Sequence, residues 1–290
     1  SYQQHFWDGP AADALIGQPC DFFASAIHAA AGRSIPATAH FTSLVTEAQR
    51  YAPLRRVLLS NAKAADILVH SKKDRVALSA VLSYEGHAHT VEQTTLHEDA
   101  LLEIEPPVSG DTLRLAIIGR LHANKRFAIA IRAFRMAQRD IPAALRIVAM
   151  IPSMSYCKNW PGERLDRHHR VYRTGTRERN TELLRDCDTT IIASGEEAGP
   201  FVAIDAMAAA RPIISTNVGA MQNRLSLFPS LLVGHSADEI AIGLRELWHR
   251  TQDRSRHLAY CRSLRARYNS HHRHKLISQQ YNTLILNSLS

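Results

Sequence analysis

The sequence predicts an α/β fold with parallel sheets, divided into two domains. Residues 189–220 read as strand, sharp turn, helix and strand in close order, which is the pattern of a βαβ unit. Residues 113–137 begin in the same way, with a buried strand, a short loop and a helix that has one apolar face. Two prolines and a glycine at 106–110 mark a linker, so the second domain is predicted to begin near residue 107.

The first predicted domain covers residues 1–106. Alanine-rich segments before Pro36 favour helices, and residues 37–43 favour a short strand that carries His40. Residues 64–71 predict a buried strand that ends in a capping-box-like sequence. A single histidine such as His40 also fits a buried or capping role, because isolated histidines are seldom functional.

The second domain is predicted over residues 107–270, and its first strand leads into Gly119 and Arg120. Asn124 can cap the following helix, which would place Lys125 in the first helical turn. A cation in that turn opposes the helix dipole, and an anion bound beside it would explain the placement. Two solvated surface cations, Arg120 and Lys125, are the alternative.

Two acids surround the next helix start. Gly199-Pro200 predicts a helix that begins near Pro200, since proline is tolerated in a first turn. Glu197 then lies just before the helix and Asp205 about a turn and a half inside it. The helix N-terminus would suit a phosphate, with the carboxylates accepting hydrogen bonds from sugar hydroxyls. A solvated Glu197 and an Asp205 that only complements the helix dipole are the alternative.

These motifs, in this order, resemble the family 4 retaining glycosyltransferases (glycosyl transferases group 1), which have the GT-B fold of two Rossmann-like domains. The resemblance implies that Arg120 and Lys125 hold the donor diphosphate. It also implies that Glu197 binds donor sugar hydroxyls and Asp205 the ribose hydroxyls. The second acid is usually Glu in the family, so a shorter Asp205 would give a looser or water-bridged ribose contact. The remaining donor-binding positions implied by the motifs are Gly119, Gly175, Gly199, Pro200 and Phe201.

The resemblance implies transfer of a sugar from a nucleotide diphosphate donor to an acceptor, with retention at the anomeric carbon. His40 and Glu197 would be the catalytic residues, His40 by positioning the sugar. Because protein groups would hold the diphosphate charge, no metal or other cofactor is expected. The expected donor is a UDP- or GDP-sugar, and the acceptor a carbohydrate, a lipid-linked compound or a small molecule.

The chain before His40 is shorter than in most members of that family. The N-terminal Rossmann-like domain is therefore expected to be incomplete, through truncation, reduction or supply of the missing part by a partner subunit. Residues 271–290 are expected to form a terminal helix that crosses back to the N-terminal domain. A non-catalytic nucleotide-sugar-binding subunit of a transferase complex is the alternative function.

Charge and cysteine usage limit the other function classes. A formal net charge of +8 with 16 histidines favours anionic partners, including an anionic membrane surface. Nucleic-acid binding is the weakest alternative, because no zinc-finger, RNP or basic-zipper pattern is present. The histidine cluster at 271–274 reads as a solvated helix entry, not a metal site, since no carboxylate or cysteine completes it. Four scattered cysteines and no apolar run of about 20 residues favour a cytoplasmic protein, peripheral at most to the membrane.

Overall fold

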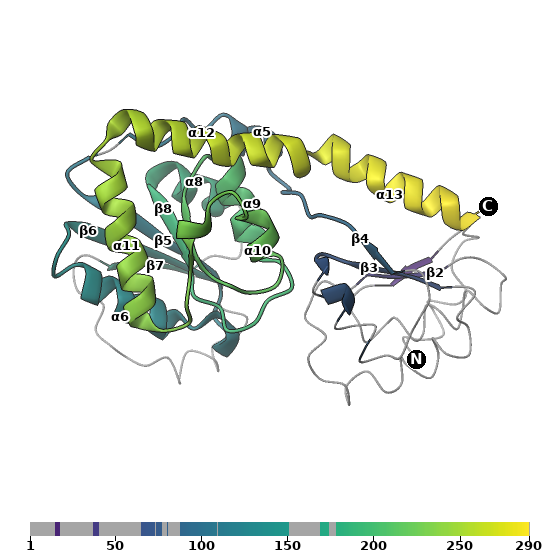
Figure 1. Cartoon of the computed structure of the whole chain (residues 1–290), viewed down its shortest axis with the longest axis horizontal. Coiled ribbons are helices and arrows are strands. Elements are labelled where there is room, and N and C mark those ends of the chain that lie inside the picture. The colour runs from purple at the N-terminus through teal and green to yellow at the C-terminus, as the bar shows by residue number, and fades with distance from the viewer. Residues whose placement is uncertain are drawn as a thin grey trace. The chain divides into compact units, whose positions relative to one another are not determined.

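The chain forms two compact units, as the computed structural model shows (Figure 1). The structure describes residues 15–17, 37–40, 65–72, 74–76, 80, 88–108, 110–150, 169–173 and 178–289. One unit comprises residues 1–92 and 275–290, and the other comprises residues 93–274. The division falls before the proline linker that the sequence indicates, because Leu101 and Ile104 are buried in the core of the second unit.

The described strands of the first unit form one parallel sheet. Their order is β1-β2-β3-β4, and their bounds are β1 (Leu15–Gly17), β2 (Ala37–His40), β3 (Ala65–Val69) and β4 (Ala88–Thr90). The predicted strands at 37–43 and 64–71 are confirmed as β2 and β3. His40 is the last residue of β2 and pairs in register with Leu68 of β3.

The C-terminal helix α13 (His274–Leu289) contributes to the core of this first unit. Ile277 is buried with Leu68 and Val91, and Tyr281 and Leu284 pack against them. Burial raises the pKa of the Tyr281 hydroxyl to about 12. The terminal helix predicted within residues 271–290 is confirmed as α13.

The second unit is built on a sheet whose six described strands are all parallel, in the order β10-β9-β8-β5-β6-β7. The strands are β5 (Leu113–Arg120), β6 (Ala143–Met150), β7 (His169–Arg173), β8 (Thr189–Ile192), β9 (Ile213–Thr216) and β10 (Leu232–Val233). The helical segments are α5 (Glu98–Leu102), η3 (Ala123–Lys125), α6 (Phe127–Ala137), α8 (Glu178–Asp186), α9 (Phe201–Ala208), α10 (Met221–Arg224), η4 (Pro229–Leu231), α11 (Ala237–Thr251) and α12 (Arg254–His271). The βαβ unit predicted over residues 189–220 is confirmed as β8, α9 and β9.

The chain changes direction across this sheet between β5 and β8. Helix α6 connects β5 to β6 on one side, whereas α9 connects β8 to β9 on the other, and right-handed crossovers therefore place α6 and α9 on opposite faces. Helix α11 packs with α6, and α12 packs with α9. Such a switch point leaves a crevice outside the carboxyl ends of the two strands, where α/β proteins bind ligands.

Helix α9 is buried almost all round and is anchored at its C-terminus. Ala210, with φ 55°, turns the chain, and its N–H and that of Arg211 donate to the carbonyls of Met207 and Ala206. This is a Schellman arrangement in which alanine takes the left-handed position that usually belongs to glycine. Arg265 of α12 donates to the Ala208 carbonyl at 2.9 Å.

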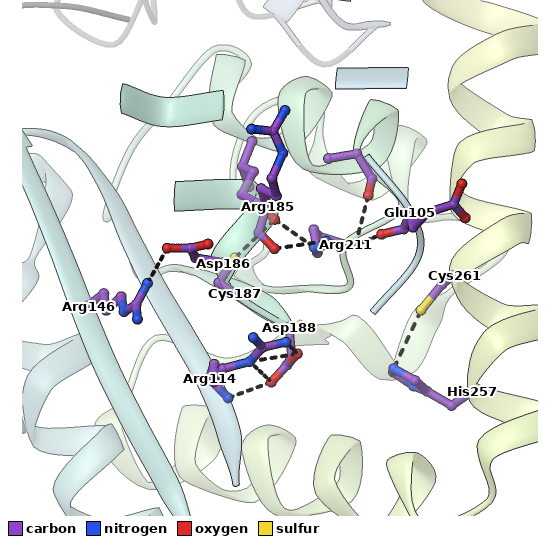
Figure 2. Close-up of polar contacts among 12 residues, drawn as sticks. Glu105, Arg114, Arg146, Arg185, Asp186, Cys187, Asp188, Arg211, His257 and Cys261 are labelled. Carbon is purple, nitrogen blue, oxygen red and sulfur yellow. Dashed lines mark hydrogen bonds and ion pairs between the residues drawn. The ribbon is translucent and has the colours of Figure 1, made fainter. Parts of the chain in front are cut away.

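The buried guanidinium of Arg211 connects three segments of the chain (Figure 2). It donates to the carbonyl oxygens of Leu184 at 2.7 Å, Glu105 at 2.7 Å and Ala209 at 3.1 Å. Two of these carbonyls belong to the C-terminal ends of α8 and α9, where the helix dipole favours a cation. Arg211 therefore fixes α9 at the end opposite to the candidate site.

Candidate functional site

Two loops meet at the switch point between β5 and β8. One follows β5 and contains residues 121–126, and the other follows β8 and contains residues 193–200. The Gly195 N–H donates to the Asn124 carbonyl at 2.8 Å, so the two loops are joined through their backbones. Residues far apart in the sequence thus form one edge of the crevice.

Lys125 and Glu197 form an ion pair across these loops. The Lys125 ammonium donates to Glu197 Oε1, which also accepts from the Ser194 hydroxyl at 3.0 Å. The side chains of Lys125 and Glu197 are 23% and 17% exposed, so the pair is accessible from solvent but largely enclosed. Among the described residues, no hydrogen bond or ion pair involves Glu197 Oε2.

The predicted helix start at Asn124 is wrong. Residues Ala123–Lys125 form the short 3-10 turn η3, capped by His122 Nδ1, which accepts from the Asn124 N–H at 3.3 Å. Helix α6 begins only at Phe127, after Arg126 has taken a left-handed conformation with φ 46°. The local capping preference of asparagine is overridden because the Asn124 backbone is bound to the opposite loop at Gly195.

Gly119 and Arg120 are the last two residues of β5. Arg120 is the last residue of the strand and is exposed, and its side chain makes no hydrogen bond or ion pair within the described residues. Gly119 lies under the Lys125 stem, where a Cβ would be 3.9 Å from Lys125 Cδ. An added methyl group would fit there, so packing within the chain does not require glycine.

A buried arginine forms a hydrogen bond to the backbone at the start of α9. Pro200 is the N-cap of α9, which confirms the predicted helix start. The fully buried Arg224 donates to the Pro200 carbonyl at 3.0 Å and to Gln93 Oε1 at 2.5 Å. A Cβ on Gly199 would lie 2.6 Å from Gln93 Oε1, so any other residue at that position would force these buried side chains to shift.

The accessible face of α9 carries Phe201 and Asp205. These residues are four apart and therefore lie on the same side of the helix. Phe201 is 52% exposed and Asp205 is partly exposed, whereas Ala203, Ile204 and the residues from Ala206 to Ala210 are buried. Asp205 thus lies on the side of α9 that faces away from the core, in the same unit as Glu197.

Two predicted site residues and the predicted histidine cluster do not contribute described side chains to this site. Gly175 lies outside the described residues, and nothing is described of the His40 side chain. The histidine cluster at 271–274 is not fully solvated as predicted, because His272 is buried and its Nδ1 donates to the Gln93 carbonyl at 2.9 Å. Desolvation, and then the nearby Arg224 charge, lower the pKa of His272 to about 3.

The described part of the chain shows neither a metal cluster nor a membrane span. No group of three or more His, Cys, Asp or Glu side chains in the described ranges could hold a metal ion. None of the helices in those ranges is both long enough and apolar enough to cross a membrane.

Four residues that support the two loops or the start of α9 were not predicted from the sequence: Ser194, Arg126, Gln93 and Arg224. Ser194 and Arg126 adjoin predicted site residues, so proximity in the sequence was an available signal. Gln93 and Arg224 are separated by 131 residues, and no local pattern indicates that they meet.

Residues 112–250 match the family model described as glycosyl transferases group 1. This segment contains both loops of the crevice and is similar to glycosyl transferases group 1 domains. No curated protein matches the chain.

Several solved structures share the fold. A glycosyltransferase from Rickettsia africae aligns with a TM-score of 0.79 at 13% identity, covering 96% of this chain and 77% of its own. Sucrose-phosphate synthase from Thermosynechococcus elongatus aligns with a TM-score of 0.74 at 16% identity, covering 98% and 75%. HepE from Anabaena, in complex with UDP-glucose, aligns with a TM-score of 0.75 at 14% identity, covering 99% and 81%. At these identities the likeness shows the fold alone, an α/β fold of the GT-B type.

Proposed function

We propose that this chain, which contains a segment similar to glycosyl transferases group 1 domains, transfers a sugar from a nucleotide diphosphate donor to an acceptor with retention at the anomeric carbon. The observation that carries the proposal is the meeting of Lys125 and Glu197 at the switch point of the sheet. A cation and an acid at this point can bind different parts of the donor. The cation would bind the diphosphate and the acid would bind the sugar.

The diphosphate is proposed to bind Arg120 and Lys125. Arg120 is exposed at the carboxyl end of β5, and its guanidinium can bind phosphate oxygens with two parallel hydrogen bonds. Lys125 reaches the same edge of the sheet from η3. Both cations would stabilise the negative charge that grows on the leaving diphosphate, and such electrostatic stabilisation usually contributes more to the rate than any other single effect.

The sugar is proposed to bind Glu197. Lys125 and Ser194 both bind its Oε1 and so fix the carboxylate, while Oε2 can accept hydrogen bonds from donor sugar hydroxyls. Asp205 is proposed to accept from the ribose hydroxyls, since it lies on the accessible face of α9. The solved complexes of HepE with UDP and with UDP-glucose support a uridine nucleotide as the first donor to test.

The reaction is proposed to need no divalent metal, because protein cations hold the diphosphate. Addition of EDTA should therefore leave the rate unchanged. A rate that EDTA abolishes and magnesium or manganese restores would contradict this part of the proposal.

The proposal is tested by binding and then by turnover. A donor that binds only the folded state stabilises it by about 2.7 kcal/mol at a hundredfold excess over its Kd, so thermal unfolding with UDP-, GDP- and ADP-sugars identifies the donor. Release of the nucleoside diphosphate in the presence of candidate acceptors then measures transfer, and NMR of the product gives the anomeric configuration. Binding without turnover for every acceptor would favour the non-catalytic nucleotide-sugar-binding subunit.

A further inference from the structure

Arg126 has a backbone conformation that arginine seldom adopts. Its φ of 46° is left-handed, and among the described non-glycine residues only Ala210 shares a positive φ. A side chain at Cβ makes this conformation unfavourable, whereas glycine adopts it freely. Arg126 also stands directly before α6, whose first turn has no acid to balance it. A cation in this place opposes the helix dipole.

The guanidinium of Arg126 lies against Gly195 in the opposite loop. A Cβ on Gly195 would lie 2.5 Å from Arg126 Nε and 2.7 Å from both Cζ and Nη2, which is closer than real contacts allow. Because these three atoms are nearly equidistant, the plane of the guanidinium faces Gly195. The arginine is therefore seated on the loop that carries Glu197, and a side chain at residue 195 would displace it.

Arg126 brings a positive charge that the described residues do not neutralise. Within the described ranges its guanidinium makes no hydrogen bond or ion pair, whereas the neighbouring Lys125 is paired with Glu197. A guanidinium has five N–H donors and suits the oxygens of a phosphate. When its plane is covered by Gly195, the donors still point outward from its edge.

We propose that Arg126 is a binding residue for the diphosphate of the donor, seated on Gly195 and presenting its N–H groups to phosphate oxygens. This inference rests on the proposed function. The two neighbouring cations then have different roles. Lys125 binds both Glu197 and the diphosphate, whereas Arg126 binds only the diphosphate. Diphosphate affinity then depends on Arg126, although glycine would adopt the left-handed backbone conformation at this position with less strain.

The test uses a substitution that suits the backbone and removes the charge. Arg126→Gly should leave the Tm equal or raise it, because glycine favours the left-handed conformation. It should weaken UDP binding, measured by titration calorimetry, by about tenfold or more, as expected for loss of a charge-assisted hydrogen bond. Arg126→Lys should weaken binding less. Arg132→Gln, at an exposed cation on the same helix, is the control and should bind UDP as the wild type does.

The outcomes separate this inference from the proposed function. Unchanged UDP affinity in Arg126→Gly overturns the inference and leaves the proposed function intact. If the wild type binds pyrophosphate but not UDP, loss of pyrophosphate binding in Arg126→Gly supports the anion site and contradicts the nucleotide donor. A wild type that binds neither ligand overturns both.

Discussion

The ammonium of Lys125 is bound to the carboxylate of Glu197, 72 residues further along the chain. The pair joins the loop after β5 to the loop after β8, at the place where the sheet changes direction. A diphosphate that binds Lys125 must compete with Glu197 for its charge. The free protein therefore holds its own cation and acid together, and donor binding is expected to loosen this pair.

Glu197→Gln should strengthen the binding of UDP, which has a phosphate but no sugar to be transferred. The substitution removes the acid that competes for Lys125, and a partly exposed ion pair is worth up to about 1 kcal/mol, or about fivefold in affinity. The same variant should lose sugar transfer, because the neutral amide is a weaker acceptor for donor hydroxyls. Titration calorimetry with UDP and a turnover assay check the two effects. Glu196→Gln, at the exposed neighbouring acid, is the control and should change neither. Weaker UDP binding in Glu197→Gln would contradict the competition.

Gly199→Ala should destabilise the start of α9. The new Cβ would lie 2.6 Å from Gln93 Oε1 and 2.8 Å from Arg224 Nη2, so the buried hydrogen bonds behind Pro200 must shift. Overpacking of this kind costs about 1–3 kcal/mol of unfolding free energy. Gly110→Ala is a matched control, because no atom lies within 4 Å of its added Cβ. Urea unfolding that shows equal stability for the two variants would argue against the described packing of Gly199.

Ala210→Gly should cost much less stability than Ala206→Gly, although both alanines are fully buried. At Ala210, relief of left-handed strain of about 1–2 kcal/mol offsets the lost methyl contacts. At Ala206, inside α9, glycine costs about 1 kcal/mol in helix propensity in addition to the lost methyl group. Urea unfolding compares the two variants with the wild type. Equal losses would show that Ala210 is not strained.

His272 should make the second unit less stable in mild acid. Its folded pKa of about 3 lies below the ordinary value of 6.5, so the unfolded chain takes up the proton first as the pH falls. Stability from the neutral imidazole is complete above about pH 6.5 and is lost progressively toward pH 3, by up to about 1.4 kcal/mol per pH unit.

This pH dependence is measured by urea unfolding at pH 7 and pH 5. The wild type should lose about 1–2 kcal/mol more than His272→Asn, whose amide can still donate to the Gln93 carbonyl but does not titrate in this range. His249→Gln, at an exposed position on α11, should keep the wild-type dependence. If His272→Asn is as acid-sensitive as the wild type, His272 is not the responsible group.

Most of the second unit could be predicted because its signals are local. The apolar run of β5, the helical spacing of the buried residues in α6 and the Gly-Pro punctuation before α9 each determine their element with few long-range contacts. The exact entry to α6 could not be predicted from them. It depends on the hydrogen bond between Asn124 and Gly195, which forms only when β5 and β8 are neighbours.

The candidate site divides in the same way. Lys125 and Glu197 could be predicted as neighbours, because each follows a strand of one parallel sheet and the carboxyl ends of such strands share an edge. Arg224 behind Pro200 could not, since its burial and its contact with Gln93 depend on the tertiary fold. The sequence shows that Arg126 is next to Lys125. Its left-handed backbone conformation and its contact with Gly195 follow only from the structure.

A donor site at this crevice is tested most directly by a calorimetric titration of UDP into the wild type and Lys125→Ala, with Arg132→Ala as the exposed control on α6. We expect the wild type to bind UDP and Lys125→Ala to bind it about ten- to a hundredfold more weakly, corresponding to about 1.5–3 kcal/mol for a charge-assisted hydrogen bond. The control should bind as the wild type does. Equal affinity in the wild type and Lys125→Ala, or a wild type that binds no nucleoside diphosphate, would contradict a donor site at this crevice.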